Sequence, residues 1–152
     1  MDTKEIFDRQ YNRIYRIALL YLKNTVDAED AAQTIFVKYI EKKPGFKNQD
    51  HETAWFITTT KNYCKDFLKS FWNRNVKLGE IPDSQNKNNT ESLIPVILNL
   101  PDKYSEVLYL YYYEGYKTKE ISKLLDIKES TVQTRLYDGR KRLKNILETE
   151  GI

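Results

Sequence analysis

Residues 117–147 carry two apolar patterns of helical period, joined by a short turn. The first pattern predicts a helix over residues 118–125 that is capped by Thr118, and the second predicts a longer helix that begins at Ser130 or Thr131. The inward positions of the longer helix are Val132, Leu136, Gly139, Leu143 and Ile146. This arrangement predicts a helix-turn-helix, whose second helix enters the major groove of DNA.

The outward face of the longer helix carries side chains suited to DNA. Gln133 can pair with adenine, and Thr134 can touch a thymine methyl group or a base edge. Asp138 is unusual beside phosphates, so we expect it to pair within the helix with Arg135 or Arg142. The alternative is an amphipathic surface helix whose charges are only solvated. Gly139 has no side chain, and we expect it to let the two helices of the pair approach closely.

Helical spacing also runs through the first half of the chain, where it predicts three helices. We expect Asp27 to cap the second helix, whose inward stripe includes Tyr39 and Ile40, and Thr53 to cap the third after a polar loop at residues 46–52. Residues 73–90 break the pattern. Five of these 18 residues are asparagine, and the segment also contains Gly79 and Pro82, which interrupt helices. The expected fold class is all-α, with two small helical domains, residues 1–72 and 92–152, joined by a flexible linker at residues 73–91.

Composition excludes several classes of site. A single cysteine and a single histidine exclude a disulfide framework, multi-cysteine metal sites and paired-histidine motifs. Near Asp50-His51-Glu52 no nucleophile, glycine-rich phosphate loop or second metal ligand is evident, so we expect no enzyme and no cofactor. The longest apolar run is seven residues, and the N-terminus does not look like a signal peptide. We expect a cytoplasmic protein.

The charge distribution says more than the net charge of +3. Asp27, Glu29 and Asp30 form an acidic block without a base, whereas residues 55–74 and 130–147 are basic helical segments. Basic helices of this kind are typical of proteins that bind nucleic acid.

Two sets of motifs resemble one family. The segments LPDKYSEVL (100–108), EGYKTKEI (114–121), STVQTRL (130–136) and RKRL (140–143) resemble the fourth conserved region of bacterial RNA polymerase sigma factors. The segments DAEDAAQTIF (27–36) and AWFI (54–57) resemble their second region. Two such regions with a short linker are the layout of the small extracytoplasmic-function (ECF) class. The resemblance implies a transcription initiation factor; the alternative is a stand-alone helix-turn-helix regulator.

The resemblance also implies partners. In this family the acidic motif of the second region binds the clamp helices of the polymerase β′ subunit, and the fourth region binds the β-subunit flap. Here the polymerase-binding role falls to Asp27, Glu29, Asp30, Gln33 and Thr34. Acids at a helix start also stabilise the helix dipole, so helix capping alone is the alternative interpretation. Members of the family commonly have an anti-sigma factor as a further partner. Tyr109, Tyr112 and Tyr113 could form a surface for it or could equally belong to the core.

The DNA-binding residues follow from the same resemblance. Contacts to the minus-10 element fall to Phe46, Asn48, Gln49, Lys61, Lys65 and Lys69, although Phe46 and Trp55 are as readily explained as core residues. Contacts to the minus-35 element fall to Thr131, Gln133, Thr134, Arg135, Tyr137 and Lys141. Members of the family commonly carry basic residues where this chain has Gln133 and Asp138, so its recognition helix is less positive at the reading end.

Overall fold

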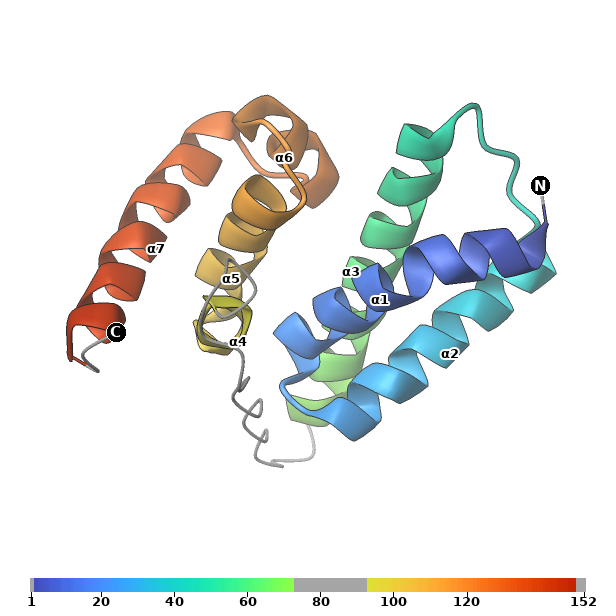
Figure 1. Cartoon of the computed structure of the whole chain (residues 1–152), viewed down its shortest axis with the longest axis horizontal. Helices are drawn as coiled ribbons and strands as arrows, with labels where there is room; N and C mark the ends of the chain where they lie inside the picture. The colour runs from blue at the N-terminus through green and yellow to red at the C-terminus, as the bar shows by residue number, and fades with distance from the viewer. Residues whose placement is uncertain (1, 73–92, 150–152) are drawn as a thin grey trace. The chain divides into compact units, whose positions relative to one another are not determined.

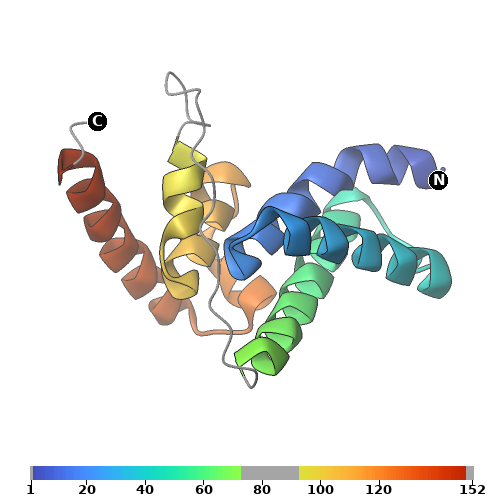
Figure 2. The same cartoon turned by 90° about the horizontal axis from the view of Figure 1, so that it is seen from below.

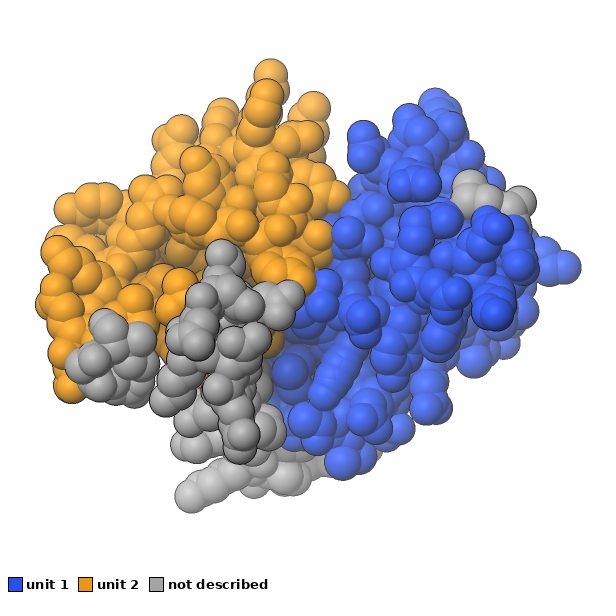
Figure 3. Space-filling model, viewed as in Figure 1, with its two compact units in different colours: residues 1–80 blue, residues 81–152 orange. Residues whose placement is uncertain are grey.

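The computed structural model describes residues 2–72 and 93–149, and all regular secondary structure in these ranges is helical (Figure 1). The chain divides into two compact units, residues 1–80 and 81–152 (Figure 3). The predicted all-α class with two helical domains is confirmed. The predicted linker, residues 73–91, lies outside the described residues, so the exact domain boundaries stay a prediction.

Unit 1 is a bundle of three helices: α1 (Thr3–Leu22), α2 (Thr25–Lys42) and α3 (Gln49–Trp72). The first helix packs along both others (Figure 1 and Figure 2). Its apolar stripe meets theirs in a core that includes Ile6, Ile14, Ala32, Ile35, Phe36 and Phe56. Burial of these stripes, rather than helix propensity alone, stabilises a bundle of this size.

Asparagines, not the predicted residues, cap α2 and α3. At α2, the Asn24 side chain accepts a hydrogen bond from the Asp27 backbone N–H at 2.8 Å and donates one to the Asp27 carboxylate at 2.7 Å. At α3, Asn48 Oδ1 accepts from the His51 backbone N–H at 2.8 Å. Asparagine is among the strongest N-cap residues, so α2 begins three residues and α3 five residues before the sequence-based prediction. The predicted loop at residues 46–52 is therefore shorter, because α3 already begins at Gln49.

Unit 2 contains α4 (Ile94–Asn99), α5 (Asp102–Leu108), the π-helical turn η2 (Tyr109–Tyr113), α6 (Thr118–Leu125) and α7 (Glu129–Thr149). The last helix packs along α5 and α6 (Figure 1). Together α6, the turn and α7 form the predicted helix-turn-helix, with Val132 and Leu136 of α7 buried.

Thr118 does not cap α6. The Lys117 backbone N–H instead donates to the Glu120 carboxylate at 2.9 Å. The Thr118 hydroxyl donates to the Glu129 carboxylate at 2.7 Å and so links the first residues of α6 and α7. This contact fixes the starts of the two helices relative to each other.

Gly139 allows a close helix approach, but its partner is α5 and not α6. A Cβ atom at this position would lie 3.1 Å from Leu108 Cδ1 and 3.3 Å from Tyr104 Cβ. Leu108 and Tyr104 are both buried. The missing side chain therefore serves the contact between the long helix and the middle of the domain.

No helix in residues 2–72 and 93–149 is long and apolar enough to cross a membrane. The same ranges contain no group of three acidic, histidine or cysteine side chains that could hold a metal ion.

Candidate polymerase and promoter interface

The outer face of α2 is acidic at its centre and apolar at its ends. Glu29, Asp30 and Gln33, three of the five predicted polymerase-binding residues, are exposed. The other two are engaged with their own helix: Asp27 in the cap of Asn24, and Thr34 through a hydrogen bond from its hydroxyl to the Asp30 carbonyl at 2.9 Å.

Three exposed aliphatic side chains extend this face, and sequence reasoning missed them. Val26 is 66% exposed, Val37 51% and Ile40 51%. Ile40 was expected in the buried stripe, and the structure corrects that prediction. With Asp30 and Gln33 these residues recur at steps of four, three, four and three, the spacing of a heptad seam. We name this set, together with Glu29, the α2 face. Such a seam is typical of a helix that packs against another helix or a coiled coil.

An aromatic cluster lies beside the segment that precedes α3. The Phe46 ring is 6.1 Å from that of Tyr39, in a stacked arrangement, 5.9 Å from that of Trp55 and 5.5 Å from that of His51. Trp55 in turn packs edge-on against Phe56, which is fully buried. Phe46 and Trp55 are thus half-buried against the core, and only part of each ring is open to a ligand.

Of the predicted minus-10 residues at the cap of α3 and along this helix, only some are accessible. Asn48 and Gln49 are exposed, although Asn48 uses its side-chain oxygen as the helix cap. Lys65 and Lys69 are exposed as well. Lys61 is 7% exposed, which contradicts its predicted place beside them.

The burial of Lys61 has a simple cause. It lies one turn after Ile57 and less than one turn before Cys64, and these two residues and Leu68 form the buried stripe of α3. The 3.6-residue period therefore places Lys61 on the inward side of the helix.

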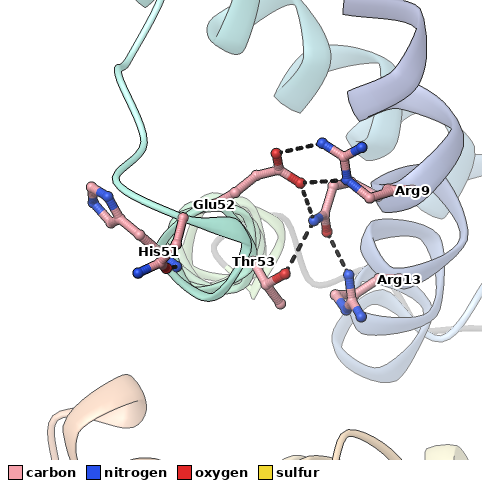
Figure 4. A network of polar contacts seen from close by, with 7 residues as sticks. Arg9, Arg13, His51, Glu52 and Thr53 are labelled. Atoms are coloured by element: carbon pink, nitrogen blue, oxygen red, sulfur yellow. Dashed lines mark hydrogen bonds and ion pairs between the residues drawn. The ribbon is translucent and has the colours of Figure 1, made fainter. Parts of the chain in front are cut away.

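A polar network joins the start of α3 to α1 (Figure 4). The Glu52 carboxylate is fully buried and receives two hydrogen bonds from Arg9, from NH2 to Oε1 at 2.8 Å and from Nε to Oε2 at 3.1 Å. Gln10 Nε2 donates to Glu52 Oε2 at 2.7 Å and lies 3.1 Å from the Thr53 hydroxyl. Arg13 donates to Gln10 Oε1 at 2.7 Å. Burial by itself would raise the pKa of Glu52, but these hydrogen bonds and the charges of Arg9 and Arg13 lower it overall.

The reading face of α7 is open. Gln133, Thr134, Tyr137 and Lys141 are exposed and Thr131 is half-buried. The Lys141 ammonium lies 5.0 Å from the centre of the Tyr137 ring.

Arg135 is engaged within the protein. Its NH1 lies 3.6 Å from the Glu106 carboxylate, whose side chain is only 6% exposed. This residue is one of the predicted minus-35 contacts, and in the structure it also pairs with a buried acid of α5.

In the described part of unit 2, the structure shows no ion pair between Asp138 and either Arg135 or Arg142. Arg135 pairs with Glu106, and the Arg142 guanidinium lies 4.8 Å from the centre of the Tyr104 ring. Asp138 is half-buried and lines an open pocket of about 330 Å³ with Lys103, Thr131 and Thr134 among the other lining residues.

A second pocket of unit 2 is an apolar groove. It has a volume of about 330 Å³ and is lined by Leu93, Ile97, Tyr112, Leu143 and Leu147, with Arg140, Lys144 and Glu148 at its rim. Among the three tyrosines of uncertain role, Tyr112 is 49% exposed, Tyr109 is buried and Tyr113 is half-buried. Only Tyr112 therefore belongs to a surface, and the other two contribute mainly to the core.

Comparison with known sequences matches both units to one family. The family model described as Sigma-70 region 2 matches residues 6–74, and that described as Sigma-70, region 4 matches residues 91–143. These matches span most of unit 1 and most of unit 2.

Similar proteins and structures agree with this match. The RNA polymerase sigma factor SigV of Bacillus subtilis is 27% identical over 91% of this chain and 86% of its own length. The ECF RNA polymerase sigma factor SigW of the same organism is 27% identical over 94% of this chain and 87% of its own length. The sigma factor RpoE from Bartonella quintana, solved with the anti-sigma factor NepR, has the same fold, with a TM-score of 0.79 at 17% identity over 95% of this chain and 96% of that chain. The chain belongs to the ECF class of the sigma-70 family of RNA polymerase sigma factors.

Proposed function

We propose that the two domains of this sigma factor, which directs core RNA polymerase to promoters, have separate binding roles. A region 2 domain, residues 1–72, binds the polymerase and the minus-10 element, and a region 4 domain, residues 92–152, binds the minus-35 element. The linker, residues 73–91, sets their reach. Because two weak DNA contacts on one scaffold reinforce each other, neither domain needs to bind DNA tightly alone. The chain acts in the cytoplasm and is not an enzyme, since the polymerase supplies the catalysis.

The α2 face is the observation that carries the polymerase contact. Glu29, Asp30 and Gln33 are exposed at its centre, and exposed aliphatic residues flank them at heptad spacing. An isolated capping role would explain acids at the helix start but not Val37 and Ile40 more than two turns later. The clamp helices of the β′ subunit are a coiled coil, so a helix with an acidic and apolar seam is a suitable partner surface.

In unit 1 the surface around the start of α3 binds the minus-10 element. Gln49 and the free part of the Asn48 amide can hydrogen-bond an unstacked base, and the half-buried ring of Phe46 offers an edge beside it. Lys65 and Lys69 hold the strand by charge. Lys61, only 7% exposed, offers little surface for such a contact.

In unit 2 the open face of α7 takes the minus-35 element. Gln133 and Thr134 read base edges near the start of the helix, whereas Lys141 contacts phosphate. Thr131 and Tyr137 flank them, and Arg135 adds positive charge beside its pair with Glu106.

The apolar groove of unit 2 binds an apolar segment of a partner protein. Its floor is aliphatic and aromatic, and two of its three rim residues, Arg140 and Lys144, are basic. We assign it to the flap of the polymerase β subunit. An anti-sigma factor is a second partner of this chain, as in the complex of RpoE with NepR, and Tyr112 at the groove is the tyrosine accessible to it.

A double variant tests the proposal. Asp30→Ala with Gln33→Ala removes two of the three polar residues at the centre of the α2 face. We expect it to abolish run-off transcription and to weaken binding to core polymerase, without unfolding the chain. The matched control is Asp8→Ala with Asn12→Ala, which removes an exposed carboxylate and an exposed amide from α1. Wild-type transcription by the Asp30/Gln33 variant would mean that the α2 face is not the polymerase contact.

A further inference from the structure

The buried network around Glu52 is not explained by either interface. Its carboxylate has no exposed surface, so it cannot contact DNA or polymerase itself. A buried ion pair is a poor source of net stability, because the cost of removing charges from water offsets much of their attraction. The network therefore calls for a geometric explanation.

The network holds α3 at its first turn. Arg9 and Gln10 of α1 bind the Glu52 carboxylate through three hydrogen bonds, two of them from a planar guanidinium whose geometry fixes the orientation of the carboxylate. Gln10 is fixed in turn by Arg13. The position of the first turn of α3 relative to α1 is thus determined from the buried side.

The same turn is tied to the segment before it. The Glu52 backbone N–H donates to the Asn48 carbonyl at 3.1 Å, and the His51 backbone N–H donates to the Asn48 side chain at 2.8 Å. His51 Nδ1 accepts from the Lys47 backbone N–H at 3.1 Å. A displacement of Glu52 would therefore move Asn48 and the adjacent Gln49. It would also disturb Phe46, whose ring lies 5.5 Å from that of His51 in the same turn.

We propose that Glu52 is a positioning residue for the minus-10 surface. Through Arg9 and Gln10 it holds Phe46, Asn48 and Gln49 in one arrangement before DNA arrives. This inference rests on the proposed minus-10 role of those three residues. A site that captures an extruded base needs such support, because recognition groups must be held within about 0.5 Å of their working positions.

The experiment compares strand opening with polymerase binding. Holoenzyme is assembled from core polymerase and full-length wild-type or Glu52→Gln protein, on a promoter selected from a random library by the wild-type holoenzyme. Opening is followed by a fluorescent base analogue in the minus-10 element, at a temperature where circular dichroism shows both proteins folded. Arg9→Lys, which keeps the charge but loses the two-point contact, is the second variant. Asp50→Asn, which removes an exposed carboxylate from the same turn, is the matched control.

We expect Glu52→Gln to slow opening by roughly ten- to a hundred-fold, the loss typical of a site displaced by about 1 Å. Arg9→Lys has a smaller effect in the same direction, and Asp50→Asn opens DNA as the wild type does. Affinity for core polymerase is unchanged in all three. Normal opening by Glu52→Gln, or a parallel loss of polymerase affinity, overturns the positioning role.

Gln49→Ala separates this inference from the proposed function. If Gln49→Ala is defective and Glu52→Gln is not, only the positioning role is overturned. If Gln49→Ala opens DNA normally, the assignment of the minus-10 surface is wrong, and the positioning role is overturned with it.

Discussion

Arg9 and Glu52 lie 43 residues apart in the sequence, yet the Arg9 guanidinium donates two hydrogen bonds to the Glu52 carboxylate, the shorter of 2.8 Å. Arg9 retains partial exposure, with 29% of its side chain accessible, whereas the Glu52 side chain has none. The contact therefore joins the partly exposed guanidinium of Arg9 on α1 to the buried carboxylate of Glu52 on α3. It fixes the start of α3, the part of unit 1 to which we assign minus-10 recognition.

The stability of unit 1 should depend on pH through Glu52. The pKa of this carboxyl is lowered from 4.5 in the folded protein, because the hydrogen bonds and charges around it outweigh the effect of burial. A carboxyl group with a lowered folded pKa contributes stability that is complete above its unfolded pKa and is lost as the pH falls through the folded pKa. The difference in the free energy of unfolding between wild type and Glu52→Gln should therefore be constant well above pH 4.5. It should shrink as the pH falls below 4.5.

Urea unfolding followed by tryptophan fluorescence measures this difference, because both tryptophans, Trp55 and Trp72, belong to unit 1. A difference that stays constant between about pH 7 and pH 3 would show that the carboxylate charge does not stabilise the fold.

Gly139→Val should loosen unit 2. The new side chain would enter the space held by Leu108 and Tyr104, and overpacking of this kind costs about 1–3 kcal/mol. Hydrogen exchange of the amides in α5 and α7 should speed up accordingly. Asn145→Val, at an exposed position of the same helix, is the control and should leave exchange unchanged. Equal exchange in both variants would mean that the two helices have room to separate.

Gln133→Ala and Lys141→Ala should have different effects on minus-35 recognition. A side chain that reads a base contributes about 1–3 kcal/mol of discrimination, so Gln133→Ala should relax the preference at one base position. Lys141→Ala should weaken binding to all sequences and reduce the salt slope by about 0.9, the value for one phosphate contact. Holoenzyme affinity for a set of single-base promoter variants at several salt concentrations measures both effects. If the two variants give the same profile, the separation of reading and positioning on α7 is wrong.

The exposed aliphatic residues of the α2 face should contribute to polymerase binding. Val37→Ser with Ile40→Ser removes apolar surface that the partner would cover, and fully burying such a side chain is worth about 1.5–3 kcal/mol. The affinity for core polymerase should fall by roughly tenfold or more, since about 1.4 kcal/mol is a factor of ten. Tryptophan fluorescence should be unchanged, because both side chains are about half exposed in the free protein. Wild-type affinity would restrict the interface to the acidic centre of the face.

The sequence predicted the helices well and their ends poorly. Apolar spacing alone located the three helices of unit 1 and the helix-turn-helix of unit 2, because a buried stripe must repeat with the helical period. A cap depends on which of several suitable side chains comes first, so Asn24 and Asn48 replaced Asp27 and Thr53.

The candidate site was predictable where exposure followed from charge and not where contacts were distant. Glu29, Asp30 and Gln33 are exposed, as expected for polar side chains. Ile40 is also exposed, although it is apolar. The buried position of Glu52 depends on a partner in another helix, which no local pattern reveals. The charge of Lys61 predicts an exposed position beside Lys65 and Lys69. Its spacing of four residues from the buried Ile57 instead indicates a position in the buried stripe of α3.

Selection from a random promoter library tests the central claim most directly. The full-length chain and core polymerase, together and separately, are each incubated with the library, and the retained sequences are determined. Together they should retain sequences with two conserved elements at a fixed spacing, and the chain alone should retain no defined sequence. Enrichment of the same two elements by the chain without polymerase would contradict the account.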